Sequence, residues 1–173
     1  RSEYQLYLIE EEIGDNYSLS CSVFVGDVCK TETIKSIFQN KRPQILFHAA
    51  AHKHLPMMER QPSESVANNA MGTAKLAKLS AEFEVEKFVF VSTDKAINPS
   101  SVMGATKRMA EIALQSLQCN NEVKTKFCSV RFGNVMGSSG SVIPLFKKQI
   151  KKGGPVTVTD PKITRYFMTI PEA

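Results

Sequence analysis

The segment KFVFVS at residues 87–92 limits most strongly what this chain can fold into. After the lysine come four consecutive β-branched or aromatic residues, with no polar residue between them. A continuous hydrophobic strand of this kind is typical of a parallel sheet that is covered on both faces. Parallel strands need long crossover connections, usually helices, so the segment predicts an α/β protein.

Segments with strand and helix patterns alternate along the rest of the chain. Strands are expected at residues 21–25, 45–47, 87–92, 125–131 and 156–158. Helices are expected at residues 3–13, from 31 to before Pro43, and at 63–83, 102–118 and 142–152. This order predicts a Rossmann-like doubly wound parallel sheet across residues 1–173, in which residues 134–173 begin the substrate-binding portion.

One expected motif is missing, because the chain contains no GxGxxG phosphate-binding loop. Gly133, Gly137 and Gly140 have the wrong spacing for it. We therefore expect the first βαβ segment to precede Arg1 and part of the substrate lobe to follow Ala173. On this view we expect the isolated chain to bind NAD(P)+ weakly or not at all, and a fragment that is inert by itself is one of the alternatives. The residue that distinguishes NAD from NADP would also lie upstream.

Composition excludes several classes of function. The net charge of +5 comes from dispersed basic residues, so nucleic-acid binding is not expected. No apolar run approaches the roughly 20 residues of a membrane span, so anchoring would depend on segments outside the chain. The cysteines form no CxxC pair, as in reduced cytoplasmic proteins. His48, His52 and His54 lack a matching set of cysteines or carboxylates, so no metal site is expected.

The candidate chemistry lies after the expected strands, where α/β sheets bind their ligands. Ser92, Thr93, Asp94 and Lys95 follow the KFVFVS strand. An adjacent carboxylate and amine favour each other's charged forms, and partial burial changes the pKa of both. The alternative interpretation is a turn with an exposed ion pair.

Two further segments carry candidate residues. Met103 and Lys107 are four residues apart and share a helix face. From the residues alone, the pair is a core Met with an exposed Lys. The loop of residues 137–141 offers backbone N–H groups to phosphate or caps a helix, and Arg165 pairs with a diphosphate or anchors a loop.

Together these segments resemble the UDP-N-acetylglucosamine 4,6-dehydratases, the CapD-like polysaccharide-biosynthesis branch of the extended short-chain dehydrogenases/reductases. The resemblance covers nearly the whole chain and follows the family's order. It is carried by Gly26-Asp27-Val28, HAAAHKHLPMME at 48–59, Asn69 with Gly72-Thr73, FVFVSTDKAINP at 88–99, MGATKR at 103–108, VRFGNVMGSSGSVIPLF at 130–146, and GGPVTVTD with ITRYFM within 153–168.

The resemblance implies a role for each matching position. Catalysis would involve Thr93, the acid–base pair Asp94 and Lys95, Met103 in place of the usual Tyr, and Lys107, which would hold the nicotinamide ribose. The NAD or NADP site would include Asp27, Val28, Ala49, Ala50, Lys53, Ser92, Lys107 and Val135. Residues that contact the UDP-sugar would be Lys53, Ser92, Thr93, Asn134, Gly137, Ser138, Ser139, Gly140, Ser141 and Arg165.

The implied reaction is a redox-neutral dehydration to a UDP-4-keto-6-deoxy sugar. Lys95 would remove the C5 proton and Asp94 would assist loss of the C6 hydroxyl, while the acceptor of the C4 hydroxyl proton is Asp94 or a water bound to Thr93. Met103 resembles the branch associated with retention at C5. The alternatives are an epimerase or 5-inverting dehydratase, and a catalytically silent dinucleotide-binding regulator. The complete protein is expected to be a homo-oligomer in the cytoplasm or at the cytoplasmic face of the membrane.

Overall fold

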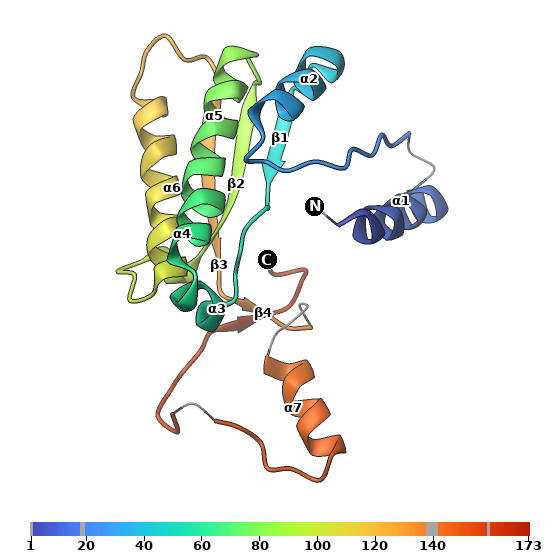
Figure 1. The fold of residues 1–173 in the computed structure, drawn as a ribbon, viewed down its shortest axis with the longest axis vertical. Helices are drawn as coiled ribbons and strands as arrows, with labels where there is room; N and C mark the ends of the chain where they lie inside the picture. The colour runs from blue at the N-terminus through green and yellow to red at the C-terminus, as the bar shows by residue number, and fades with distance from the viewer. Residues whose placement is uncertain (1, 18–19, 138–141, 159) are drawn as a thin grey trace.

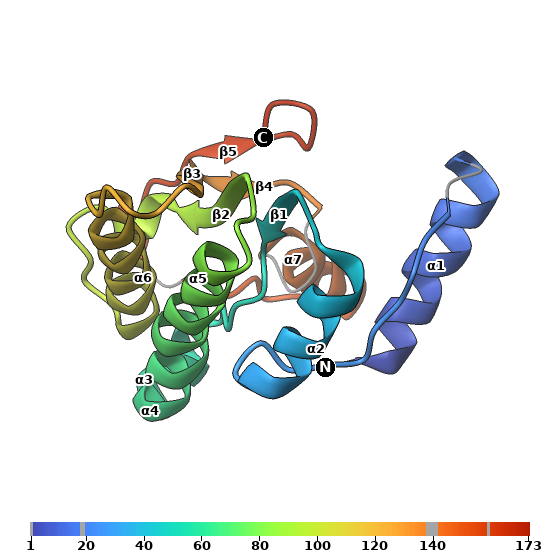
Figure 2. The same ribbon diagram turned by 90° about the horizontal axis from the view of Figure 1, so that it is seen from above.

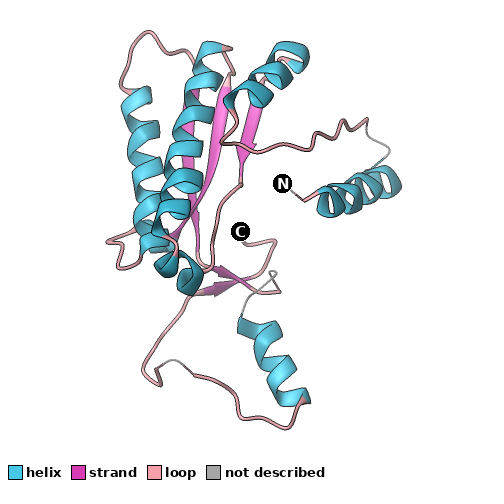
Figure 3. Cartoon of the chain, viewed as in Figure 1, coloured by secondary structure: helices cyan, strands magenta, loops and turns pink. Residues whose placement is uncertain are grey.

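The computed structural model describes residues 2–17, 20–137, 142–158 and 160–173. Its main sheet is parallel and has the strand order β1 (Ile45–His48), β2 (Lys87–Thr93), β3 (Lys126–Phe132). Helices connect the three strands along the chain (Figure 3). A parallel sheet with helical crossovers confirms the α/β class predicted from the KFVFVS segment.

Three helices cover one face of this sheet: α2 (Thr31–Lys41), α5 (Thr73–Glu82) and α6 (Val102–Gln118) (Figure 2). The core lies between them and the sheet. Phe88 and Phe90 of β2 are fully buried there, against Leu76 of α5 and Leu114 of α6. Burial of large aromatic and aliphatic side chains is the main term that stabilises such a layer.

The other face of the sheet is more open. Phe47 is 73% exposed and Ile45 is 53% exposed, while Val89 and Val91 are half-buried. The prediction of burial on both faces of β2 therefore holds for only one face within the described part of the chain. The reason is that the helices that pack on the sheet, α2, α5 and α6, all lie on the same side (Figure 2).

The helix predicted for residues 63–83 is one continuous helical segment, but its middle is a π-helix, which was not predicted. It begins at Pro62 as α4 (Pro62–Ser65), passes through the π-helix η1 (Val66–Gly72) and continues as α5. A short helix that was not predicted, α3 (Leu55–Arg60), precedes it. Among the described helices, none has the length and hydrophobicity required to cross a membrane.

The N-terminal segment departs from the prediction. The helix α1 (Glu3–Tyr17) has no buried residue and stands apart from the sheet (Figures 1 and 2). Residues 21–25 are not a strand, because no described strand lies beside them to form a ladder. They pack on α2 instead: Lys41 Nζ donates to Ser22 Oγ at 3.0 Å and lies 5.7 Å from the centre of the Phe24 ring.

The C-terminal segment contains a second, two-stranded parallel sheet of β4 (Asn134–Val135) and β5 (Phe167–Met168), which was not predicted. The helix α7 (Val142–Lys151) lies between them in sequence and matches the prediction. Residues 156–158 are not the predicted strand. Thr157 bonds to the side chain of Gln149 on α7 through both its backbone N and its Oγ1, at 3.1 and 2.8 Å, so its N–H is not available to a ladder.

Candidate active site

The carboxyl ends of β1, β2 and β3 meet at one edge of the sheet, because parallel strands run in one direction. His48 ends β1, Thr93 ends β2 and Phe132 ends β3. The polar segments that follow these strands therefore gather at this edge, near β4 (Figure 1). This edge is the candidate active site.

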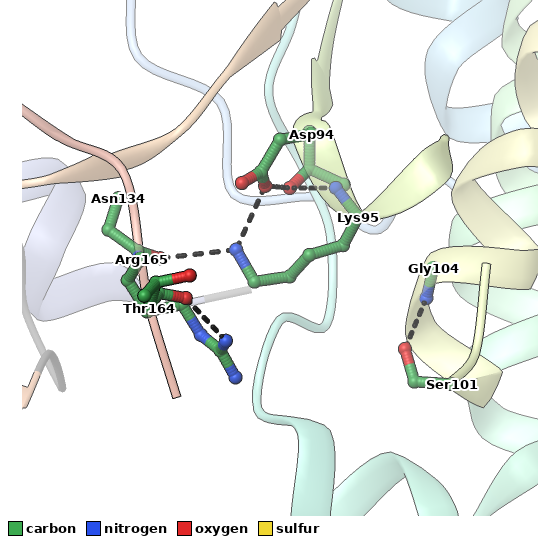
Figure 4. Close-up of polar contacts among 8 residues, drawn as sticks. Asp94, Lys95, Ser101, Gly104, Asn134, Thr164 and Arg165 are labelled. Carbon is green, nitrogen blue, oxygen red and sulfur yellow. Dashed lines mark hydrogen bonds and ion pairs between the residues drawn. The ribbon is translucent and has the colours of Figure 1, made fainter. Parts of the chain in front are cut away.

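A chain of hydrogen bonds joins Thr93, Asp94 and Lys95 at the end of β2. Thr93 caps the 3₁₀-helix η2 (Asp94–Ala96), and its Oγ1 donates to Asp94 Oδ1 at 3.0 Å. Lys95 Nζ donates to the same carboxylate oxygen at 2.9 Å (Figure 4). The side chains of Lys95 and Asp94 are 26% and 32% exposed. The pair is thus partly buried, unlike the exposed surface pair of the alternative interpretation.

The surroundings of Asp94 determine its charge. Burial by itself would raise the pKa of Asp94, but the hydrogen bonds from Lys95 and Thr93 and the attraction of the ammonium together hold that pKa below its usual value. Asp94 is therefore a carboxylate at neutral pH. A carboxylate can accept a proton that reaches it through the Thr93 hydroxyl.

Asn134 and Arg165 reach the same place from the second sheet. Asn134 Oδ1 accepts a hydrogen bond from Lys95 Nζ at 3.1 Å (Figure 4). Arg165 precedes β5, and its Nη1 donates to the Thr164 carbonyl at 2.9 Å. A cavity of about 240 Å³ is lined by Leu55, Asp94, Lys95, Ile97, Asn98, Ser100, Ser101, Thr164, Arg165 and Tyr166. The predicted acid–base pair and the predicted phosphate ligand thus share one cavity. Val135 lies next to Asn134 in β4 and is half-buried.

Met103 and Lys107 are both buried on α6, each 5% exposed. The expectation of an exposed Lys107 is therefore wrong, whereas that of a core Met103 is confirmed. Lys107 Nζ donates to the Val91 carbonyl at 2.6 Å and lies 3.9 Å from the centre of the Phe90 ring. Burial lowers the pKa of Lys107 to about 8, against the opposing attraction of Glu111. The amine is held by the carbonyl and the aromatic face at the end of β2.

Ser92 belongs to a buried polar cluster beneath the site. Its hydroxyl donates to Glu111 Oε1 at 2.7 Å, and Arg131 and Arg108 bind the same carboxylate. With its proton bound to Glu111, the Ser92 hydroxyl offers a ligand only acceptor lone pairs. Glu111 was not predicted from the sequence as part of the site. Its position four residues after Lys107, on the same face of α6, was the one available signal.

The loop after β1 is fixed by Asn69, a residue of the π-helix η1. Asn69 is fully buried, and its side chain binds both backbone groups of His52, accepting from N at 2.8 Å and donating to O at 3.0 Å. Ala49 and Ala50 are exposed on this loop, as is the side chain of Lys53. A loop pinned at His52 with small exposed side chains before it leaves room for a ligand at the end of β1.

The structure does not bring every predicted residue to this cavity. Asp27 and Val28 lie in the turn that precedes α2, where Asp27 Oδ1 accepts from Cys29 N at 2.9 Å. Gly137 has a positive φ of 79°, a conformation that glycine adopts without strain. The predicted contacts of Ser138, Ser139, Gly140 and Ser141 lie outside the described residues.

Comparisons with known proteins agree with the geometry. A family model described as "Polysaccharide biosynthesis protein" matches residues 1–173. The capsular polysaccharide biosynthesis protein CapD of Staphylococcus aureus is 53% identical over 173 residues, which are 99% of this chain and 29% of that protein.

Solved structures show the same fold. The structure of Pen from Bacillus thuringiensis superposes on this chain with a TM-score of 0.91 at 40% identity, over 100% of this chain and 54% of that one. The Thermus thermophilus UDP-glucose 4-epimerase, solved in complex with NAD, superposes with a TM-score of 0.73 at 25% identity, over 83% of this chain and 55% of the epimerase. These matches confirm the Rossmann-like fold and the predicted family resemblance. The chain spans 29% of the curated relative and about half of each solved structure.

Proposed function

Since the chain belongs to the polysaccharide biosynthesis protein family, we propose that it carries the acid–base centre of an NAD(P)-dependent UDP-N-acetylglucosamine 4,6-dehydratase. The observation that carries this proposal is the hydrogen-bonded chain of Thr93, Asp94 and Lys95 on the wall of the Arg165 cavity. A dehydration needs groups that move protons at two neighbouring carbons of the sugar. An adjacent carboxylate and amine supply them.

The residues at the sheet edge fit the nicotinamide end of the cofactor. Lys107 has three N–H donors, and among the described residues the Val91 carbonyl is the acceptor it binds. Its other donors suit the hydroxyls of a ribose. The phosphate-binding GxGxxG motif is not part of this sequence, so the fit concerns the nicotinamide half. When bound, NAD(P)+ would supply a hydride acceptor for C4 and, after reduction, a hydride donor for C6.

The protons can be followed through the chain's own residues. The Thr93 hydroxyl, which already donates to Asp94, passes the C4 hydroxyl proton to that carboxylate. Lys95 acts as the base in its free-amine form: after it has given up its own proton to solvent, it takes the proton from C5, which the C4 ketone makes acidic. Protonated Asp94 then donates to the leaving C6 hydroxyl, which departs as water. Lys95 returns its proton to C5, so both groups regain their starting states and the configuration at C5 is retained.

A UDP-sugar 4-epimerase is the second candidate, favoured by the likeness to the Thermus enzyme. An epimerase needs a proton acceptor only at the C4 hydroxyl. The site also contains Lys95, paired with Asp94 beside Thr93, which an epimerase would not need. In addition, Met103 stands where the related enzymes usually have a Tyr. These two features favour dehydration.

The test uses the complete protein that contains this chain, supplied with UDP-N-acetylglucosamine and NAD+ or NADP+. We expect a product that has lost one water and contains a 4-keto group, detected by mass spectrometry and NMR. Lys95→Met and Asp94→Asn should each reduce turnover by about 10²–10⁴-fold while substrate binding is kept. The control is Lys124→Met, which removes an exposed lysine paired with Glu84. An isomer of unchanged mass, or near-parental activity of either active-site variant, would refute the proposal.

A further inference from the structure

We propose that Asn134 is a positioning residue for Lys95, which fixes the amine through its side-chain oxygen and ties it to the strand pair next to Arg165. This inference rests on the proposed function and refines it, because the family resemblance implies for Asn134 only a contact with the substrate. Asn134 Oδ1 accepts from Lys95 Nζ at 3.1 Å. Asn134 and the backbone of η2 lie on opposite sides of the amine (Figure 4).

The chemistry of the amide suits a base that changes its charge. A lysine amine is carried on a flexible four-carbon stem, so an unsupported amine samples many positions. The bond to Asp94 is strongest while Lys95 is an ammonium. The amide oxygen of Asn134 is neutral, and it can accept an N–H from either the ammonium or the free amine. Asn134 therefore holds the amine in place after Lys95 has lost its proton.

The backbone of Asn134 is itself fixed. Asn134 N donates to the Tyr166 carbonyl at 3.0 Å, and Met136 N donates to the Met168 carbonyl at 2.9 Å. The preceding residue, Gly133, allows this close approach, since a Cβ there would lie 3.2 Å from the Tyr166 carbonyl oxygen. The segment that presents Arg165 and the amide that holds Lys95 are thus joined by one strand pair. A substrate whose phosphate binds Arg165 would find the base already placed.

The charges around Lys95 make the role measurable. Asp94 on η2 is its carboxylate neighbour, and Arg165 before β5 is the other charged group on the cavity wall. Tyr166 is the remaining titratable side chain there, and it is 85% exposed. Asn134→Asp keeps the shape of the side chain but places a second carboxylate against the amine. A second negative charge at this distance favours the ammonium form, which is inactive as a base.

The experiment compares wild type, Asn134→Asp and Asn134→Ala in the complete protein, with Asn121→Asp as a control that adds the same charge in an exposed turn. We expect Asn134→Asp to move the acidic limb of the kcat profile upward by about one pH unit or more. Asn134→Ala should lower kcat and the rate of C5 proton exchange with solvent by about tenfold or more, with a smaller change in KM. Asn121→Asp should leave both unchanged.

A second readout does not depend on turnover. The titration of Lys95, followed by NMR of its labelled side chain, should move upward in Asn134→Asp. An unchanged Lys95 titration, or an Asn134→Ala variant in which only KM rises, would overturn the proposal and leave Asn134 as a substrate contact. Because the NMR shift is measured without substrate, it tests Asn134 even if wild type fails to dehydrate UDP-N-acetylglucosamine. That failure would refute the proposed function alone. If Asn134→Ala does not fold, the isosteric Asn134→Asp carries both readouts.

Discussion

The guanidinium of Arg131 on β3 donates two hydrogen bonds to the carboxylate of Glu111 on α6, Nε to Oε1 at 2.9 Å and Nη2 to Oε2 at 2.6 Å. Glu111 is only 2% exposed, and the Ser92 hydroxyl and Arg108 also bind it. A buried carboxylate with four donors joins the end of β2, the end of β3 and the middle of α6. This contact holds the layer on which the candidate active site is built.

Replacing Glu111 should destabilise the fold more than replacing an exposed glutamate. Removing one partner of a buried ion pair costs about 3–5 kcal/mol, and about 2–4 kcal/mol is expected for Glu111→Ala, because both arginines remain partly exposed to solvent. Urea unfolding measures the change. Glu84→Ala, which removes one partner of the exposed pair with Lys124, is the control and should cost less than about 1 kcal/mol.

The same carboxylate predicts an acid dependence. Burial would raise the pKa of Glu111, but the bonds from Arg131, Ser92 and Arg108 outweigh it and lower the pKa to about 2. A lowered carboxylate pKa stabilises the folded state above the unfolded pKa of 4.5. That contribution is lost as the pH falls from 4.5 towards 2. Unfolding free energies measured across this range should therefore fall less steeply for Glu111→Gln than for wild type; parallel curves would contradict the assignment.

His48 predicts a loss of stability at milder acidity. It is 3% exposed, and its Nε2 lies 2.9 Å from Thr73 Oγ1. Burial, with a smaller repulsion from Lys107, lowers the pKa of His48 to about 4. The buried neutral ring therefore favours the folded state fully above the unfolded pKa of 6.5. The free energy of unfolding falls by roughly 3 kcal/mol in total as the pH falls from 6.5 to 4. His48→Gln should remove this part of the pH dependence, and an NMR titration of the ring should show it neutral at pH 5.

Lys107 is expected to destabilise the folded state while it contributes to cofactor binding. Its pKa is lowered to about 8, so the folded state holds the ammonium less well than the unfolded chain does. The penalty is complete below pH 8 and disappears as the pH rises from 8 to 10.5. In the complete protein, Lys107→Met should raise the unfolding free energy at pH 7 by up to about 3 kcal/mol, while the affinity for NAD(P)+ falls about tenfold or more in a calorimetric titration. A variant that is less stable and binds the cofactor normally would contradict both expectations.

A side chain at position 104 is expected to displace Lys95, the proposed base. Gly104 lies in the first turn of α6, where a Cβ would overlap the Lys95 carbonyl oxygen. In the complete protein, Gly104→Ala should therefore push α6 away from Lys95 and reduce turnover at least about tenfold, since small misplacements of reacting groups are costly. Gly14→Ala in α1 is the matched control, because nothing lies within 4 Å of its Cβ. It should leave turnover unchanged and favour its helix by up to about 1 kcal/mol.

Long periodic segments were predictable from the sequence, and short ones were not. The helix 102–118 and the strand beginning at Lys87 carry enough residues for their patterns to be distinct. The strands β4 and β5 have two residues each, and only their pairing across 33 residues defines them. Residues 21–25 have a strand-like composition, but a strand also needs a neighbour, which local sequence cannot show.

The same limit applies to the candidate site. Asp94 and Lys95 were predictable because they are adjacent and follow a strong strand. Glu111 and Arg131 are 20 residues apart, and Lys95 and Asn134 are 39 residues apart, so only the fold shows that they meet. The exposure of Lys107 was predicted wrongly because helical spacing gives the direction of a side chain but not what covers it.

The π-helix at Val66–Gly72 gives its helix one residue more than a regular winding would contain. Each residue of an α-helix turns the chain by about 100°, so the extra one resets the rotational phase of everything that follows. Asn69 can then hydrogen-bond to the backbone of His52, while Thr73, one turn later, hydrogen-bonds to the ring of His48. Deleting a single residue in this stretch would restore regular winding and turn one of these two contacts away from the loop that both support.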